Sequence, residues 1–224
     1  MSVSAQVILP RTLYHGTSIR RGSTELMHFT TKLLDKKYWK HGRDFGLGFY
    51  TTHLIEQPKP WAIKSSRKRA SEEGVSAHDY VPCILNIAWD TGALNEAAVL
   101  LFSDASREWA RFILDHRLQS DANKADPCNE HPDIVVGYMA DNDTGDLVSR
   151  YLYESGFEFE QFFEGIQISE EGNKMTMDGL GNQYAFCNEA LDGTLKVTGC
   201  HILEGGEWIY YGIDDPHLSE LKLL

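Results

Sequence analysis

The chain of 224 residues has the length of one globular domain. Hydrophobic residues make up 42% of it and charged residues 24%, which excludes a largely disordered protein. The formal net charge of −12 opposes binding to polyanions through bulk electrostatics, so nucleic acid is not an expected partner.

The first half of the chain alternates short extended segments with polar ones. Residues 49–52 are aromatic and β-branched and follow a glycine turn, which is typical of a strand. Pro60 suits the first turn of a helix, Gly74 is a natural helix end, and Pro82 indicates a strand start or an edge strand. The predicted strands are residues 7–9, 13–14, 49–52 and 80–89, and the predicted helices are residues 33–39 and 61–73.

The second half of the chain predicts further helices and strands. A helix capped by Ser103 or Asp104 repeats apolar residues at the spacing of one face, and residues 204–207 (Glu-Gly-Gly-Glu) predict a hairpin turn. Because helices and strands follow no regular β-α-β rhythm, we expect an α+β fold. The predicted helices are residues 103–118, 146–155 and 159–166, and the predicted strands are residues 134–140, 182–187, 196–203 and 208–212.

The sequence carries no sign of membrane insertion. No apolar stretch reaches the roughly 20 residues of a spanning helix. The first ten residues have no basic segment before their apolar run, so a Sec signal peptide is not expected. We therefore expect a cytoplasmic location, or delivery by a dedicated machine into the cytosol of a host or target cell.

The cysteines and the one basic run predict no special chemistry. Cys83, Cys128, Cys187 and Cys200 lie far apart without Cys-x-x-Cys spacing, which predicts free thiols, a reducing compartment and no metal site. Residues 64–69 (Lys-Ser-Ser-Arg-Lys-Arg) are either a solvated helix face or a patch for phosphate or an acidic partner.

Two short segments with glycine carry the strongest functional signal. In residues 13–17 (Leu-Tyr-His-Gly-Thr), an imidazole stands beside open backbone groups. In residues 44–52 (Asp-Phe-Gly-Leu-Gly-Phe-Tyr-Thr-Thr), glycine lets the backbone approach a ligand and Tyr50 offers a flat phenol. Together they can hold a planar aromatic amide and a sugar hydroxyl. Alternatively, His15 and Tyr50 are ordinary strand residues.

The order of these segments resembles the diphtheria-toxin-like ADP-ribosyltransferases, the class with a His-Tyr-Glu signature that includes the poly(ADP-ribose) polymerases. The sequence is most similar to a poorly characterised bacterial family of that superfamily, with Tyr-His-Gly and Asp-Phe-Gly-x-Gly-Phe-Tyr-Thr-Thr motifs. The resemblance covers about residues 12–192 of a single domain spanning 1–224, and leaves 193–224 as a C-terminal hairpin extension. Its five parts are His15, Tyr50, Trp109–Phe112, Asp133–Gly137 and Asn182–Phe186.

The resemblance implies a split β-sandwich that uses NAD as co-substrate and transfers ADP-ribose to a protein side chain. It implies that His15 binds a ribose 2′-hydroxyl, that the Gly16 backbone pairs with the nicotinamide carboxamide, and that Tyr50 stacks on the nicotinamide ring. Thr17 would face the adenosine side and Arg43 the phosphates, unless they are an ordinary strand end and a surface arginine. The implied NAD-binding residues are His15, Gly16, Thr17, Arg43, Gly48, Phe49, Tyr50 and Thr51.

Gln183 stands where the wider class has its glutamate, so the implied catalytic residues are His15, Tyr50 and Gln183. An amide can bind a ribose hydroxyl but brings no negative charge to a cationic transition state. This departure favours transfer of a single ADP-ribose unit. Glu160, Glu164 or Glu189 could substitute, unless they are surface or capping residues.

Two alternatives to a protein-modifying transferase remain open. One is an NAD-binding protein without turnover, which the amide at Gln183 favours. The other is the same fold acting on a small molecule or a nucleic acid. The sequence does not separate a toxin or effector from a housekeeping enzyme.

Overall fold

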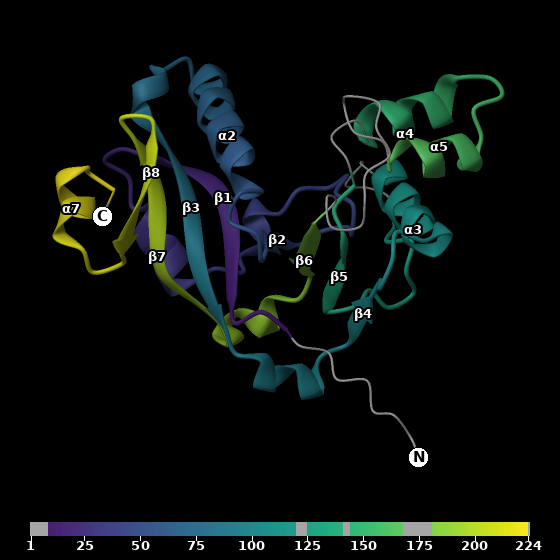
Figure 1. Cartoon of the computed structure of the whole chain (residues 1–224), viewed down its shortest axis with the longest axis horizontal. Coiled ribbons are helices and arrows are strands. Elements are labelled where there is room, and N and C mark those ends of the chain that lie inside the picture. Colours follow the sequence, from purple (N-terminus) through teal and green to yellow (C-terminus); the bar gives the residue numbers. More distant parts are fainter. Residues whose placement is uncertain (1–8, 120–124, 141–143, 168–180, 224) are drawn as a thin grey trace. The chain divides into compact units, whose positions relative to one another are not determined.

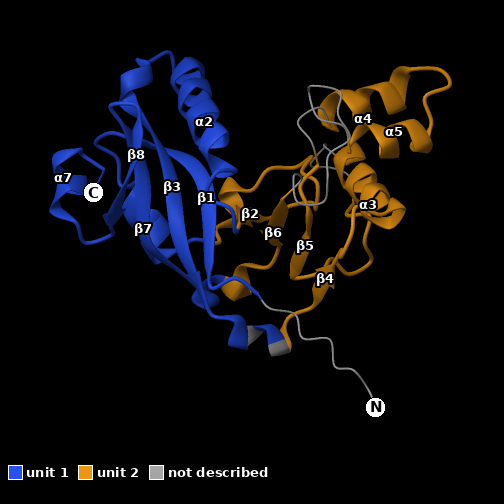
Figure 2. Cartoon of the chain, viewed as in Figure 1, with its two compact units in different colours: residues 1–33, 53–95, 192–224 blue, residues 34–52, 96–191 orange. Residues whose placement is uncertain are grey.

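The computed structural model describes residues 9–119, 125–140, 144–167 and 181–223, and it confirms the predicted α+β class (Figure 1). Most of the predicted strand at 7–9 lies outside the described residues. The chain forms two compact units, each assembled from separate segments (Figure 2). Unit 1 comprises residues 1–33, 53–95 and 192–224, and unit 2 comprises residues 34–52 and 96–191.

Unit 1 contains an antiparallel sheet with the strand order β1-β3-β7-β8. Pro82 lies near the start of β3, before the pairing with β7 begins at Cys83, which agrees with the predicted strand start. β3 pairs with β1 on one side and with β7 on the other, so it is not an edge strand. The C-terminal hairpin is part of this sheet, because β7 pairs directly with β3. The strands are β1 (Thr12–Arg20), β3 (Tyr80–Trp89), β7 (Leu195–Glu204) and β8 (Glu207–Gly212).

Helix α2 (Pro58–Glu73) packs on β1 and β3 of unit 1 (Figure 1). Its buried side chains are small and recur every four residues: Pro58, Ala62, Ser66 and Ala70. This small ridge lets the helix lie close to the sheet. The helix ends at Gly74, as predicted, with a φ of 64° that favours glycine. Unit 1 also contains α1 (Glu25–Thr31), α7 (Pro216–Glu220) and the 3₁₀ helix η2 (Ala77–Asp79).

Unit 2 contains a sheet with the strand order β4-β5-β6-β2, in which only β4 and β5 are parallel. Helices α3, α4 and α5 pack together in this unit (Figure 1). Trp109, Ile113 and Phe162 of the helices form a buried hydrophobic cluster with Val135 and Ala185 of the sheet. The strands are β2 (Phe49–Thr52), β4 (Val99–Leu101), β5 (Ile134–Tyr138) and β6 (Asn182–Phe186), and the helices are α3 (Arg107–Leu118), α4 (Thr144–Tyr153) and α5 (Phe159–Gly165).

Three details differ from the sequence predictions. Helix α3 is capped by Ser106, whose side chain accepts a hydrogen bond from the Trp109 amide, and neither Ser103 nor Asp104 is the cap. The helix predicted at 33–39 is only a 3₁₀ turn, η1 (Lys36–Tyr38). Strand β4 and helices α1 and α7 were not predicted, since segments of three to seven residues are too short for a reliable period. The other 3₁₀ helices are η3 (Thr91–Glu96) and η4 (Glu189–Thr194).

Within the segments that the structure describes, no helix combines the length and the apolar character needed to span a bilayer.

Candidate functional site

The predicted site residues are divided between the two units. His15, Gly16 and Thr17 are consecutive, half-buried residues of β1 in unit 1, paired with β3. The other predicted residues belong to unit 2, in β2, the loop before it, and β6.

Gly16 has a packing reason that needs no ligand. A Cβ at this position would lie 2.4 Å from the carbonyl oxygen of Pro58 and 3.0 Å from the Pro58 Cβ. Only glycine therefore lets the first turn of α2 approach β1 this closely. The same contact is reinforced further along by the Ser18 and Ser65 hydroxyls, which lie 3.1 Å apart.

The basic run of residues 64–69 is partly structural. The Arg69 guanidinium donates 2.7 Å to the Ser18 carbonyl oxygen and forms an ion pair with Glu25, which ties α2 to β1. Other basic residues of α2 line an open surface depression that contains none of the predicted NAD-binding residues. Its lining residues are Glu56, Lys59, Pro60, Ile63, Lys64, Arg67 and Lys68.

The Tyr50 side chain anchors the loop that precedes β2. Its hydroxyl donates to the Gly46 carbonyl oxygen at 2.7 Å and accepts from the Phe45 amide at 2.9 Å. Burial, together with the neighbouring Cys187 and Asp44 side chains, raises the pKa of Tyr50 well above its ordinary value. The phenol therefore stays neutral at physiological pH, while its ring remains half-buried.

Glycines shape this loop for two different reasons. Gly46 has a φ of +82°, a backbone conformation that residues other than glycine rarely adopt. Gly48 has no such constraint, but a Cβ there would lie 2.9 Å from the Phe186 carbonyl oxygen. The Gly-x-Gly pattern therefore seats the loop against β6.

Gln183 belongs to a buried polar network in unit 2. Its side-chain amide Nε2 donates to Asp44 Oδ2 at 3.0 Å, and the residue is only 5% exposed. The Asp44 carboxylate also accepts from Arg117 of α3, with Nε to Oδ1 at 2.7 Å. Asp44 is thus held between an amide and a guanidinium.

Tyr50 and Gln183 share one face of the β2–β6 pair. Tyr50 lies opposite Ala185, and Gln183 is two residues from Ala185 on the same strand, so the two side chains project to the same side. The Ala185 side chain belongs to the hydrophobic cluster with α3, and Tyr50 packs against that cluster. The structure therefore brings Tyr50, Asp44 and Gln183 together on the covered face of this sheet.

Phe49 and Thr51 alternate with Tyr50 and project from the opposite face. Both are buried, and the Thr51 hydroxyl donates to the Tyr184 carbonyl oxygen at 3.2 Å. Arg43 is half-buried in the loop, where its carbonyl oxygen accepts from the Gly46 amide at 3.2 Å. The unit-2 residues predicted to bind NAD are thus split between two faces of one strand and the loop before it.

Two of the three glutamates considered as substitutes for Gln183, Glu160 and Glu189, have other partners. Glu160 forms an ion pair with Arg107 on the surface of the helices. The Glu189 carboxylate accepts from the Lys36 amide at 2.9 Å, which fits the predicted surface or capping role.

Asp44 and Arg117 were not predicted as site residues. Asp44 is the first residue of the Asp-Phe-Gly-Leu-Gly segment, so its place in this motif could have marked it as a candidate site residue. Arg117 lies 73 residues further along the chain, and nothing in the local sequence connects it to Asp44.

These features define an α+β protein with a buried Gln183–Asp44–Arg117 network behind a glycine loop anchored by Tyr50. Residues 12–196 match the family described as "Protein of unknown function (DUF3990)", and the chain belongs to this family. No curated protein and no solved structure matches the chain.

Proposed function

We propose that this protein is an NAD-dependent mono-ADP-ribosyltransferase that transfers ADP-ribose to a protein side chain and releases nicotinamide. The observation that carries the proposal is the grouping of Tyr50, Asp44 and Gln183 on one face of the β2–β6 pair. In this assignment the Tyr50 ring stacks on nicotinamide and His15 binds a ribose hydroxyl. Both roles come from the resemblance of the motifs.

The chemistry fits a slow, single transfer. Departure of nicotinamide leaves positive charge on the ribose, and a negative charge nearby stabilises it. Gln183 brings no charge, but the Asp44 carboxylate lies 3.0 Å from its amide nitrogen. Because Arg117 offsets much of that charge, stabilisation of the transition state is weaker than with a free carboxylate.

An NAD-binding protein without turnover is the second candidate. It is favoured by the burial of Gln183, whose amide donates to Asp44 inside unit 2. Release of nicotinamide from NAD separates the two candidates, because only the transferase breaks the glycosidic bond. The acceptor is proposed to be a protein in the cytosol of the producing or a target cell, since the net charge of −12 disfavours a polynucleotide.

The proposal is tested by thermal unfolding with NAD and by nicotinamide release. A ligand at a hundredfold excess over its dissociation constant stabilises the folded state by about 2.7 kcal/mol. We expect Tyr50→Ala to lose most of this protection, whereas Tyr153→Ala, at a residue that is 84% exposed, should keep it. His15→Ala should bind NAD more weakly and release less nicotinamide, while its circular dichroism stays native.

Two results would reject parts of this assignment. If millimolar NAD leaves the wild-type melting curve unmoved, neither candidate function holds. If NAD protects the chain but no nicotinamide appears with cell lysate present as acceptor, the second candidate replaces the first. If nicotinamide does appear, labelled NAD incubated with that lysate identifies the acceptor by mass spectrometry of the labelled species.

A further inference from the structure

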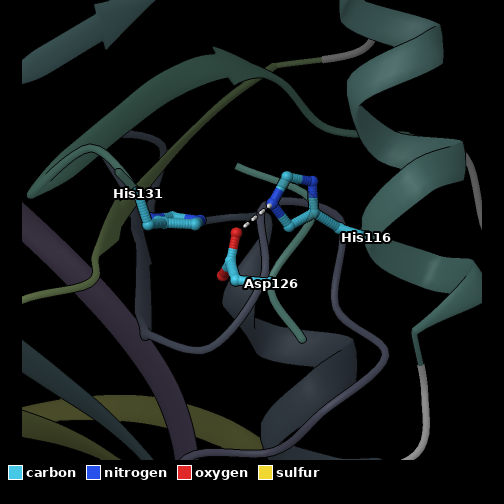
Figure 3. A group of neighbouring side chains, drawn as sticks. All are labelled: His116, Asp126 and His131. Atoms are coloured by element: carbon cyan, nitrogen blue, oxygen red, sulfur yellow. Dashed lines mark ion pairs between the residues drawn. The ribbon is translucent and has the colours of Figure 1, made fainter. Parts of the chain in front are cut away.

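Three metal-ligating side chains converge in unit 2 at a place that the NAD assignment does not use. His116 of α3 and two residues of the following segment, Asp126 and His131, each offer one ligand atom. These atoms all lie within 4.8 Å of one another, and the three side chains point toward one another in Figure 3. His116 Nε2 lies 3.8 Å from Asp126 Oδ1.

The tautomer of His116 directs a lone pair into this cluster. Its Nδ1 lies 2.7 Å from the Phe112 carbonyl oxygen, which can only accept, so the ring hydrogen is on Nδ1. Nε2 is then the unprotonated nitrogen of a ring that is 3% exposed. A backbone carbonyl that fixes the far nitrogen is the usual outer contact of a metal-binding histidine.

His131 faces more acceptors than a neutral ring can serve. Its Nδ1 lies 2.9 Å from the Pro132 carbonyl oxygen and its Nε2 lies 3.0 Å from the Phe45 carbonyl oxygen. A neutral imidazole has one ring hydrogen, so one of these contacts sets two lone pairs against each other. In the neutral ring, the nitrogen without a hydrogen is the one that can bind a cation.

Cys128 lies beside the three residues and is a candidate fourth donor, although it is outside the set whose ligand atoms all lie within 4.8 Å of one another. Its Sγ lies 3.8 Å from His116 Nε2. Zinc bonds of about 2.0–2.3 Å place tetrahedral ligand atoms about 3.3–3.6 Å apart. The 3.8 Å separations from His116 Nε2 are close to this range, whereas separations of up to 4.8 Å within the cluster must shorten when the ion binds. Imidazole, thiolate and carboxylate together form a donor set that suits Zn²⁺. The sequence prediction of no metal site followed from the absence of Cys-x-x-Cys spacing, whereas this group has one cysteine and two histidines.

The cluster touches the loop that Tyr50 anchors. A Cβ at Gly46 would lie 2.9 Å from both His116 Cδ2 and His131 Nε2, so the loop backbone packs directly on the two rings. His131 also contacts the Phe45 carbonyl oxygen. A rigid His116–His131 pair therefore limits the movement of residues 45 and 46.

We propose that His116, Asp126, Cys128 and His131 bind one Zn²⁺ ion, and that the ion stiffens the loop before β2. All four residues belong to unit 2, and the site is independent of the NAD assignment.

The test uses the full-length chain, stripped with a chelator and titrated with Zn²⁺ or Co²⁺ alone. Calorimetry should give one Zn²⁺ per chain. Co²⁺ should give the intense visible absorption of tetrahedral coordination and an ultraviolet band from the thiolate. Zn²⁺ should raise the melting temperature and slow amide exchange at residues 45–50.

Variants decide whether these residues are the ligands. Asp126→Asn and His131→Gln should weaken Zn²⁺ binding by at least about tenfold. Loss of a residue that only supports a ligand already weakens binding by about this much, and loss of a ligand itself should cost more. Cys128→Ser should remove the thiolate band. The matched control His78→Gln, at an exposed histidine outside the group, should change nothing.

The proposal has clear contrary outcomes. It is overturned if the stripped chain takes up no stoichiometric Zn²⁺, or if Asp126→Asn and His131→Gln bind it as tightly as His78→Gln does. A thiolate band that survives Cys128→Ser removes Cys128 from the site. Should His116→Gln fail to fold, Asp126→Asn still provides the test, because the Asp126 side chain is 43% exposed.

Discussion

At the scale of single residues, Asp44 explains why an amide stands at Gln183. The Gln183 Nε2 donates 3.0 Å to Asp44, and a carboxylate in its place would have no hydrogen to donate. It would also set a second negative charge against Asp44, with only Arg117 to offset both. The amide at position 183 is therefore matched to its neighbours.

We expect Gln183→Glu to lower the free energy of unfolding by about 1–3 kcal/mol, the cost of leaving buried polar groups unpaired. Adding Asp44→Asn should recover part of the loss, because the new amide can donate to the new carboxylate. Urea unfolding of both single variants and the double variant gives this coupling. Gln161→Glu, on the exposed surface of α5, is the control and should be near neutral. Equal stability of Gln183→Glu and wild type would contradict the hydrogen bond.

Tyr50 combines two roles that substitutions can separate. Tyr50→Phe keeps the ring but removes the partner of the Phe45 amide and the Gly46 carbonyl. We expect a loss of stability of about 1–3 kcal/mol with NAD binding retained, since the ring face is unchanged. Chemical denaturation and NAD titration are compared with Tyr153→Phe, an exposed control. A Tyr50→Phe variant with wild-type stability would show that the hydroxyl does not anchor the loop.

At the scale of elements, the seating of α2 on β1 depends on the absence of a side chain at Gly16. We expect Gly16→Ala to destabilise the protein by about 1–3 kcal/mol, because the new methyl group meets the backbone oxygen of Pro58 at 2.4 Å. Gly145→Ala is the matched control: it lies in α4 with no atom within 4 Å of the added Cβ. It should be neutral or stabilising by up to about 1 kcal/mol.

Thermal or urea unfolding measures both alanine variants. If Gly16→Ala unfolds like wild type but loses NAD binding, Gly16 matters for the ligand and its packing role is minor. Loss of stability without loss of NAD binding assigns it to the contact between α2 and β1.

At the scale of the whole molecule, the reactivity of three cysteine thiols reports on unfolding of the units. Cys83 and Cys200 are fully buried in unit 1, whereas Cys128 is half-buried in unit 2. A side-chain hydrogen bond with Cys200, together with burial, raises the pKa of Cys83 well above its ordinary value. The Cys83 thiol is therefore not available as thiolate in the native state.

In the chain stripped of metal, we expect an alkylating reagent to modify Cys128 early and to modify Cys83 and Cys200 only when unit 1 unfolds. Mass spectrometry of labelled peptides over time, with and without urea, gives the two rates. The control is the Cys128→Ser variant, which lacks the fast-reacting thiol and should therefore show almost no early labelling. Rapid native labelling of Cys83 would show that the unit-1 sheet opens locally.

The sequence alone determined the elements whose signals are local. The strand at Tyr80–Trp89, the end of α2 at Gly74 and the hairpin at Gly205 and Gly206 all follow from apolar runs or from glycine at a positive φ. These signals lie within a few neighbouring residues, and tertiary context did not override them. The motif order likewise indicated Tyr50 and Gln183, whose roles toward NAD remain predictions.

Only the tertiary structure decided which side chains meet. Asp44, Arg117 and Gln183 come from a loop, a helix and a strand, and no spacing rule connects them. The same is true of Gly46 and the His116 and His131 rings, which pack against each other. Contacts between residues so far apart in sequence depend on how helices and loops cover a sheet. That arrangement is set by packing of the whole unit, so no local pattern could specify the buried network or the packing of Gly46 on the two histidines.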